Sequence, residues 1–398
     1  MRIRRVGVRP VRWMAGGLVL GLAAACVPQP AVPTLPAGTG IQWVRDVGGT
    51  PNENGTYQEA YSHFTLLDGV ATGPTPVATP FFPLTSTAGP AYASFGIPVF
   101  PDGTTKFPWN GFAGEGITTA TTVNAGTTTY DVTGAGGTCR FTNVSGMYAS
   151  SRTSAAIPSP DGTKLAVFTR FDDVEASAIS TYLSIYALGA SCTRLANVSY
   201  RWSGYAGANT GDTIVSSLTV WSPDSSAILF PLNPASTPTG TRLMRLDVAA
   251  GSTPTVVLDS PTSTVLPLGW SPTGRVLIVR TGRSTTTPPT GWTSLETLPI
   301  GGGHTKVFDV LTSAVPSARA EFHVGYFVPG TSQVLYSGGT RTATASDGRV
   351  VSWPQFRIYD DLTEADAVVP GTDAPLAWHD TPSGPLLNGE FLERFIHS

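Results

Sequence analysis

The chain has 398 residues, of which 41% are hydrophobic and 13% are charged, and its formal net charge is −3. This apolar share argues against a largely disordered protein, and the slightly acidic charge provides no basic field for a nucleic-acid partner. Gly and Pro number 44 and 34. Such a composition favours many short strands joined by turns over long helices, so we predict an all-β protein.

The N-terminus has the parts of an export signal. Residues 1–12 hold five arginines, and the apolar run Trp13–Ala25 is shorter than the about 20 residues needed to cross a bilayer. The small residues Ala23–Ala25 precede Cys26, and this order resembles a bacterial lipobox, in which lipid is attached to the cysteine. We predict a lipoprotein signal peptide over residues 1–25 and lipid attachment at Cys26. The alternative is that Cys26 is a small residue near an ordinary cleavage site.

A proline-rich, uncharged segment follows over residues 26–40. Such segments are extended and semi-rigid, so we expect a tether that holds a folded domain, residues 41–398, away from a membrane. The predicted location is outside the cytoplasm, with the lipid in the cell membrane or outer membrane and the domain facing the periplasm or exterior.

A turn motif recurs in the predicted domain, as in Trp221–Phe230, which reads WSPDSSAILF. Proline presets φ in such a turn, the Asp side chain accepts a backbone N–H, and a following Gly takes a positive φ. Aligned on proline, the copies lie 49 to 63 residues apart, at Pro101, Pro160, Pro223, Pro272, Pro329 and Pro382. This period indicates a repeat architecture. The apolar runs after the turns do not alternate, so we expect both faces of these strands to be covered, with the Trp or Phe before each turn packed between sheets.

A second unit, a predicted hairpin, lies between copies of the turn motif. The hairpins begin near His63, Thr127, Tyr182, Arg242, Thr293 and Phe356. One unit of each kind makes a four-stranded antiparallel sheet. We therefore predict a six-bladed β-propeller in which residues 41–80 and 375–396 share one blade, two strands from each end, and seven blades are the alternative.

The segment Ser159–Arg170, which reads SPDGTKLAVFTR, resembles the WD40-like (PD40) repeat of TolB-like propellers. Ile185-Tyr186 and Arg194-Leu195 are similar to the hairpin segment of the same family. The resemblance covers nearly all of residues 41–398 and implies a six-bladed propeller in a bacterial lipoprotein. Members of that family commonly bind other proteins, and some are domains of enzymes. The matching motif is structural, so the resemblance implies no site residue.

Two cysteines remain besides Cys26, and the residues leave their state open. In an exported protein, Cys139 and Cys192 suggest a disulfide. Both occupy similar sites in consecutive hairpins, however, and equivalent sites on adjacent blades are expected to lie beyond the roughly 7 Å Cα limit for a bridge.

The sequence contains neither an H-E-x-x-H nor a G-x-S-x-G motif, and its five histidines are not at metal-ligand spacing. We therefore expect no catalytic residue, no metal and no cofactor. Acidic clusters at 172–175 and 360–366 offer oxygens to calcium, but acidic turns are ordinarily solvated. The segment with Tyr200, Trp202 and Tyr205 is a candidate loop for sugar or peptide binding, and the alternative is that Trp202 packs between blades.

Together these features favour a non-catalytic module that binds an envelope protein or a glycan, is attached to the membrane through Cys26 and has no nucleic-acid partner. The alternative is a lyase- or hydrolase-type propeller enzyme with its site at the mouth of a central channel. A purely structural envelope component is a third interpretation, which the sequence does not separate from the first.

Overall fold

The computed structural model describes the chain from Val32 to His397 with gaps. The described residues are 32–46, 61–76, 118–124, 127–134, 137–144, 149–173, 178–203, 213–214, 220–234, 240–283, 291–313, 325–344, 350–372, 378–381, 384–387 and 390–397. All regular elements in these ranges are β-strands, and every paired neighbour is antiparallel. The all-β prediction is confirmed.

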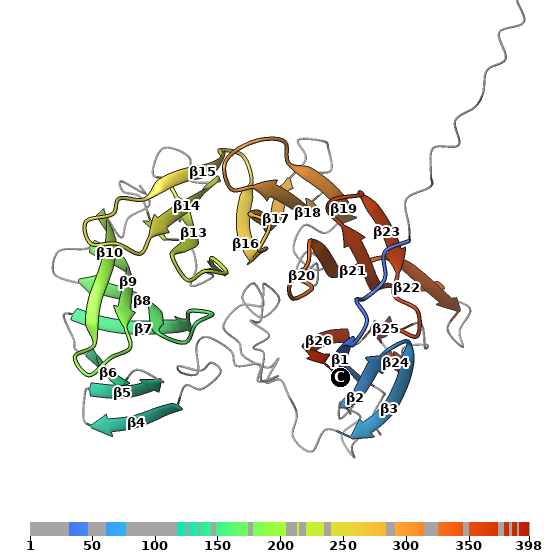
Figure 1. Cartoon of the computed structure of the whole chain (residues 1–398), viewed down its shortest axis with the longest axis horizontal. Helices are drawn as coiled ribbons and strands as arrows, with labels where there is room; N and C mark the ends of the chain where they lie inside the picture. The colour runs from blue at the N-terminus through green and yellow to red at the C-terminus, as the bar shows by residue number, and fades with distance from the viewer. Residues whose placement is uncertain are drawn as a thin grey trace, which may run out of the picture. The chain divides into compact units, whose positions relative to one another are not determined.

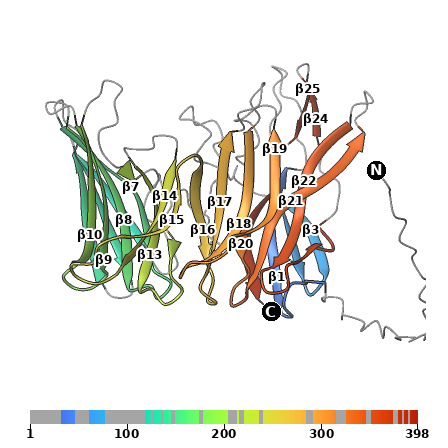
Figure 2. The ribbon, with the colours of Figure 1, turned by 90° about the horizontal axis from the view of Figure 1, so that it is seen from above.

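The strands group into sheets of neighbours in the chain (Figures 1 and 2). The first ten are β1 (Thr39–Asp46), β2 (Tyr61–Leu67), β3 (Val70–Pro76), β4 (Thr118–Asn124), β5 (Thr127–Gly134), β6 (Gly137–Val144), β7 (Ala149–Pro158), β8 (Lys164–Asp173), β9 (Ala178–Ala187) and β10 (Thr193–Ser203). The next nine are β11 (Thr213–Ile214), β12 (Val220–Trp221), β13 (Ala227–Asn233), β14 (Thr241–Asp247), β15 (Thr255–Ser260), β16 (Thr264–Trp270), β17 (Arg275–Arg283), β18 (Gly291–Pro299) and β19 (Lys306–Ser313). The last seven are β20 (Gly325–Phe327), β21 (Gln333–Thr344), β22 (Val350–Asp360), β23 (Ala365–Val368), β24 (Trp378–Thr381), β25 (Gly384–Leu387) and β26 (Glu390–His397).

The sheet order follows the predicted repeat. Sheets β7–β10, β16–β19 and β20–β23 each have four strands in sequence order, and sheet β11–β15 has five. All six predicted hairpins are present, as the pairs β2–β3, β5–β6, β9–β10, β14–β15, β18–β19 and β22–β23. The predicted turn at Pro101 lies outside the described residues.

The recurrent turn has the expected hydrogen bonds and one further hydrogen bond that the motif did not predict. In the copy at Pro223, the Ser225 N–H donates to the Ser222 carbonyl at 2.9 Å, and the Ser226 N–H donates to Asp224 Oδ1 at 3.1 Å. The unforeseen bond runs from the Ala227 N–H to Ser222 Oγ at 2.9 Å. Ser159 and Ser271 accept the corresponding bond in their own turns, so the serine before proline ties the turn to the following strand.

Successive residues of the central strands pack against different neighbouring sheets. In β13, Phe230 belongs to an apolar cluster shared with sheet β7–β10, whereas Leu229 belongs to a cluster shared with sheet β16–β19. In β17, Ile278 faces sheet β11–β15 and Val279 faces sheet β20–β23. All four side chains are 0% exposed. The prediction that both faces of these strands are covered is confirmed, and it explains why their apolar runs do not alternate.

The aromatic residues before the turns at Pro223, Pro272 and Pro329 pack between sheets, as predicted. Trp221 lies in the cluster between sheets β7–β10 and β11–β15, and its indole N–H donates to the carbonyl of Ile157 in β7 at 3.0 Å. Trp270 packs against the cluster between sheets β11–β15 and β16–β19, and Phe327 packs between sheets β16–β19 and β20–β23.

The two ends of the described domain share one sheet, but the division of strands differs from the prediction. The order is β26-β1-β2-β3, so three strands come from the N-terminal side and one from the C-terminal side. Of residues 375–396, which were expected to supply two strands, β26 joins this sheet, and Trp378–Leu387 pairs with itself as β24–β25. The reason is that β1 has its own buried side chains: Ile41 and Trp43 pack against sheet β20–β23 and place β1 between β2 and β26.

Candidate functional site

The structure places the predicted binding loop only in part. Tyr200 and Trp202 belong to strand β10, where their backbones pair with Thr181 and Ile179, so this stretch is strand and not loop. The Tyr200 side chain is half-buried and packs against the cluster between sheets β7–β10 and β11–β15. Tyr200 thus packs between sheets, and the alternative stated for Trp202, packing between blades, stays a prediction. Tyr205 and the predicted lipid site Cys26 lie outside the described residues.

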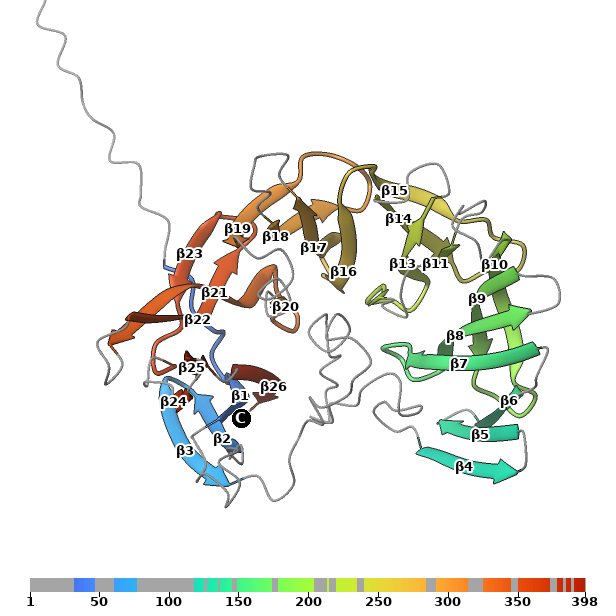
Figure 3. The ribbon, with the colours of Figure 1, turned by 180° about the vertical axis from the view of Figure 1, so that it is seen from behind.

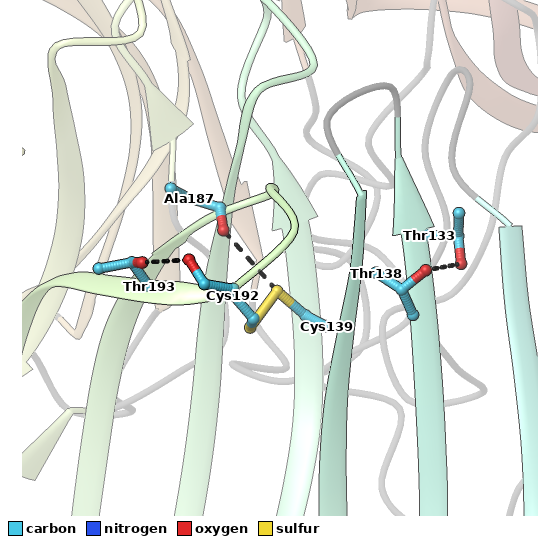
Figure 4. Close-up of a disulfide and its surroundings, with 7 residues drawn as sticks. Thr133, Thr138, Cys139, Ala187, Cys192 and Thr193 are labelled. Atoms are coloured by element: carbon cyan, nitrogen blue, oxygen red, sulfur yellow. Dashed lines mark hydrogen bonds between the residues drawn. A yellow bond between two sulfur atoms is a disulfide. The ribbon is translucent and has the colours of Figure 1, made fainter.

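Cys139 and Cys192 form a disulfide with their Cα atoms 5.1 Å apart (Figure 4). The two cysteines are therefore within bonding distance, and the expectation that they occupy equivalent hairpin positions is wrong. Cys139 is inside β6 and pairs with Val132, whereas Cys192 lies in the turn between β9 and β10, one residue before Thr193. That one-residue offset lets the turn of one sheet reach the strand of the other.

The residues around this bond bring sheets β4–β6 and β7–β10 into contact (Figure 3). Val132 and Cys139, both 0% exposed, pack against Leu165, Val167 and Leu188. Gly137 meets the backbone of the β9–β10 turn so closely that a Cβ there would lie 2.5 Å from the carbonyl carbon of Gly189. The two sheets are therefore joined by apolar packing, backbone contact and a covalent bond.

On strands β5 and β6 the described side chains of the opposite face are polar and form three cross-strand pairs. We call Thr129, Asp131, Thr133, Thr138, Arg140 and Thr142 the hydroxyl face. Thr133 Oγ1 and Thr138 Oγ1 are 2.8 Å apart, and Thr129 Oγ1 and Thr142 Oγ1 are 3.4 Å apart.

An ion pair lies between these two hydroxyl pairs. Arg140 donates from Nε to Asp131 Oδ1 at 2.6 Å and from Nη2 to Oδ2 at 2.8 Å. This double hydrogen bond to the guanidinium lowers the pKa of Asp131 and raises the pKa of Arg140. The Arg140 side chain remains 70% exposed, so its remaining N–H groups face solvent.

The hydroxyl face differs from the faces between the other sheets because its described residues are not apolar. Thr133, Thr138, Arg140 and Thr142 are all exposed. Hydroxyls donate and accept, and the guanidinium is planar and donates in a fixed geometry, so this face offers hydrogen bonds over two adjacent strands. The paired charges cancel, which suits a polar ligand without net charge.

The acidic cluster after β22 serves a structural contact. Asp361 is 3% exposed, lies 2.8 Å from Arg275 Nε in an ion pair with the neighbouring sheet β16–β19, and accepts a hydrogen bond from Arg275 Nη2 at 3.0 Å. Lys306 Nζ donates to the Asp361 carbonyl at 2.6 Å and pairs with Glu364 at 3.0 Å. These carboxylates are therefore engaged by cationic side chains, and Asp361 is buried, contrary to the expectation of a solvated turn.

Within the described ranges, no three His, Cys, Asp or Glu side chains gather as a metal site would require. The same part of the chain includes no helix with the length and apolar character for crossing a membrane.

No protein-family model and no curated protein matches the chain. Among solved structures, it is similar to an uncharacterized protein from Listeria monocytogenes EGD-e, with 10% identity, a TM-score of 0.28, and coverage of 68% of this chain and 96% of that one. It is also similar to the apo form of the AtxE2 isopeptidase, with 9% identity, a TM-score of 0.26, and coverage of 91% of this chain and 59% of that one. TM-scores this low support no conclusion about fold or activity.

Proposed function

We propose that the protein is an exported, lipid-anchored β-propeller that binds a neutral glycan of the cell envelope without chemical conversion. The single observation that carries the ligand class is the hydroxyl face, an exposed array of threonine hydroxyls around a neutralised Asp131–Arg140 pair. The sequence supports export and lipid anchoring through the apolar run before Cys26 and the proline-rich tether. It supports binding without chemical conversion through the lack of an H-E-x-x-H or G-x-S-x-G motif.

The propeller assignment is supported by the order of the sheets and by their shared cores. Five apolar clusters join, in turn, sheets β4–β6, β7–β10, β11–β15, β16–β19 and β20–β23, and the sheet formed by β26 and β1–β3. The pairing of β26 with β1 brings the two ends of the described domain into one sheet, which is consistent with a propeller. We propose six blades on this basis, in an array that is open beside the hydroxyl face, because none of these clusters of described residues joins sheet β4–β6 to sheet β26-β1-β2-β3.

A glycan is favoured over a protein partner because of the chemistry of the hydroxyl face. Stable protein interfaces have a desolvated core enriched in apolar and aromatic side chains. The described side chains of this face are threonines and one ion pair, whereas sugars present hydroxyls that match threonine and guanidinium donors.

The test is binding of the purified full-length protein to a panel of neutral and acidic soluble polysaccharides, measured by affinity electrophoresis. We expect retardation in a neutral polysaccharide, and we expect Arg140→Ala and Thr138→Val each to weaken it by about tenfold, the scale of one lost hydrogen bond to a charged or hydroxyl group. Arg194→Ala is the matched control, because Arg194 is the exposed repeat counterpart of Arg140 in β10 and should leave binding unchanged.

Three results would contradict the proposal: no retardation by any polysaccharide, equal effects of the Arg140 and Arg194 variants, or reproducible capture of a protein through this face instead. The lipid anchor is tested separately by labelling with a radioactive fatty acid in a bacterial host. Label is expected on the wild-type chain and not on Cys26→Ser, and label on both chains would exclude Cys26 as the attachment site.

A further inference from the structure

We infer that the Cys139–Cys192 disulfide is a redox-sensitive latch, whose reduction by a dithiol releases sheet β4–β6 from sheet β7–β10 while the following sheets stay folded. This concerns how one sheet is held and does not depend on which ligand the protein binds. The inference is based on the packing between these two sheets, the unequal exposure of the two cysteines and the backbone of the turn that carries Cys192.

The first step is that, among the described side chains, the apolar contact at this junction is small. Among the described residues, the cluster between sheets β4–β6 and β7–β10 has five buried members, and Cys139 is itself one of them. The cluster between sheets β7–β10 and β11–β15 has twelve. Among the described side chains of sheet β4–β6, Val132 and Cys139 are the buried members of this cluster and Phe141 packs against it, so the covalent bond adds to a limited apolar contact.

The second step is that the two sulfurs differ in their surroundings. Cys139 is 0% exposed, and its Sγ lies 3.8 Å from the carbonyl oxygen of Ala187. Cys192 is partly exposed and lies between Ser191 and Thr193, which are both exposed. Because Cys192 is the more exposed of the two cysteines, a reductant in solution reaches the bond from its side.

The reaction follows from this asymmetry. One thiolate of the dithiol attacks Cys192 Sγ, the Cys139–Cys192 bond breaks, and Cys139 leaves as a thiolate that takes a proton from water. The second thiolate of the dithiol then attacks its own sulfur in the mixed disulfide and frees Cys192, which is protonated in turn. The dithiol ends as a cyclic disulfide after giving two electrons, and both protein cysteines end as thiols.

The third step is that, once the disulfide is broken, the turn around Cys192 favours separation of the two sheets. Cys192 has a φ of 44°, in the left-handed region that a residue with a Cβ adopts at a cost. The same turn holds the Gly189 backbone against Gly137. Relaxation of Cys192 to an ordinary φ moves the turn away from Gly137, and the separated sheets then expose the apolar surface of Val132 and Leu165.

The experiment is hydrogen–deuterium exchange by mass spectrometry on the full-length protein, before and after reduction with dithiothreitol. Alkylation of both cysteines, read as a mass increase, verifies that reduction occurred. We expect amides in residues 127–144 to exchange about tenfold faster or more after reduction, because they open locally without the crosslink. Amides in residues 227–247 and 264–283 are expected to keep their rates.

A double variant, Cys139→Val with Cys192→Ser, retains an apolar side chain at the buried site and removes the bond. It should exchange as the reduced wild type does and should not respond to dithiothreitol. If the variant does not fold, the reduced wild type alone carries the test. Unchanged exchange after verified reduction, equal acceleration in all sheets, or a bond that dithiothreitol leaves intact in the folded protein would overturn the latch.

Discussion

Sheets β4–β6 and β11–β15 show two ways to hold a sheet in the same repeat array. Sheet β11–β15 has apolar clusters on both faces, one shared with each neighbour. Sheet β4–β6 has a small cluster on one face, a disulfide, and the polar hydroxyl face on the other. In the chain-entropy account, a crosslink between residues 53 apart stabilises by about 4 kcal/mol. The stabilisation from this one covalent bond is thus comparable to that from a large buried side chain. It leaves the other face of the sheet free for other uses.

The largest expected effect is on the two-sided packing. Phe230→Ala removes a 0% exposed ring from the cluster between sheets β7–β10 and β11–β15, so the free energy of unfolding should fall by about 4 kcal/mol. Urea unfolding, monitored by tryptophan fluorescence, measures this free energy of unfolding. Val256→Ala, at a 55% exposed site in β15, is the control and should change the value by less than about 0.5 kcal/mol. Equal effects of the two variants would mean that this interface does not stabilise the domain.

The next effect concerns the buried charge between sheets β16–β19 and β20–β23. Asp361→Asn leaves the largely buried Arg275 without its anion, so we expect a loss of about 3 kcal/mol in the free energy of unfolding. Asp247→Asn breaks the exposed pair with Arg245 and should cost less than about 1 kcal/mol. If the two variants are alike, the Arg275–Asp361 pair is solvated in solution and does not distinguish this interface from the surface.

The smallest effect is a pH dependence that comes from the repeated turn. Hydrogen bonds from the Ser222 and Ser226 hydroxyls and the Ser226 N–H lower the pKa of Asp224 from 3.8 to about 2. A carboxyl whose pKa is lower in the folded state stabilises that state at higher pH and loses this contribution as pH falls from about 4 to about 2. The thermal midpoint should therefore decline over this window, and it should decline less in Asp224→Asn. Parallel curves for the two proteins would show that the turn carboxylate contributes nothing.

Much of the fold could be predicted from local sequence. The Ser-Pro turns, the six hairpins and the burial of both strand faces follow from residues within ten positions of one another, because turn chemistry and apolar runs act locally. One turn departs from the expected glycine. Ser225 takes a positive φ of 58° at the position where the corresponding turns have Gly162 and Gly274, which also take a positive φ.

The candidate site could be predicted less well. The hairpin alignment treated Cys139 and Cys192 as equivalent, and the single-residue offset between them decides whether a bond forms. The alternation of Thr129, Asp131 and Thr133 was visible in the sequence as a strand pattern. Without the contact between Val132 and Leu165, however, nothing indicated which face of that strand was covered.

The sequence by itself determined that this is an all-β repeat protein with a recurrent Ser-Pro turn and hairpins of fixed order. The tertiary structure decided that β26 joins β1 in a sheet of three strands plus one, that Cys139 reaches Cys192, and that threonines form an exposed face. The physical reason is the range of the interactions. Turns and strand propensity depend on neighbours in the chain, whereas registers between distant strands depend on which side chains fill a shared core.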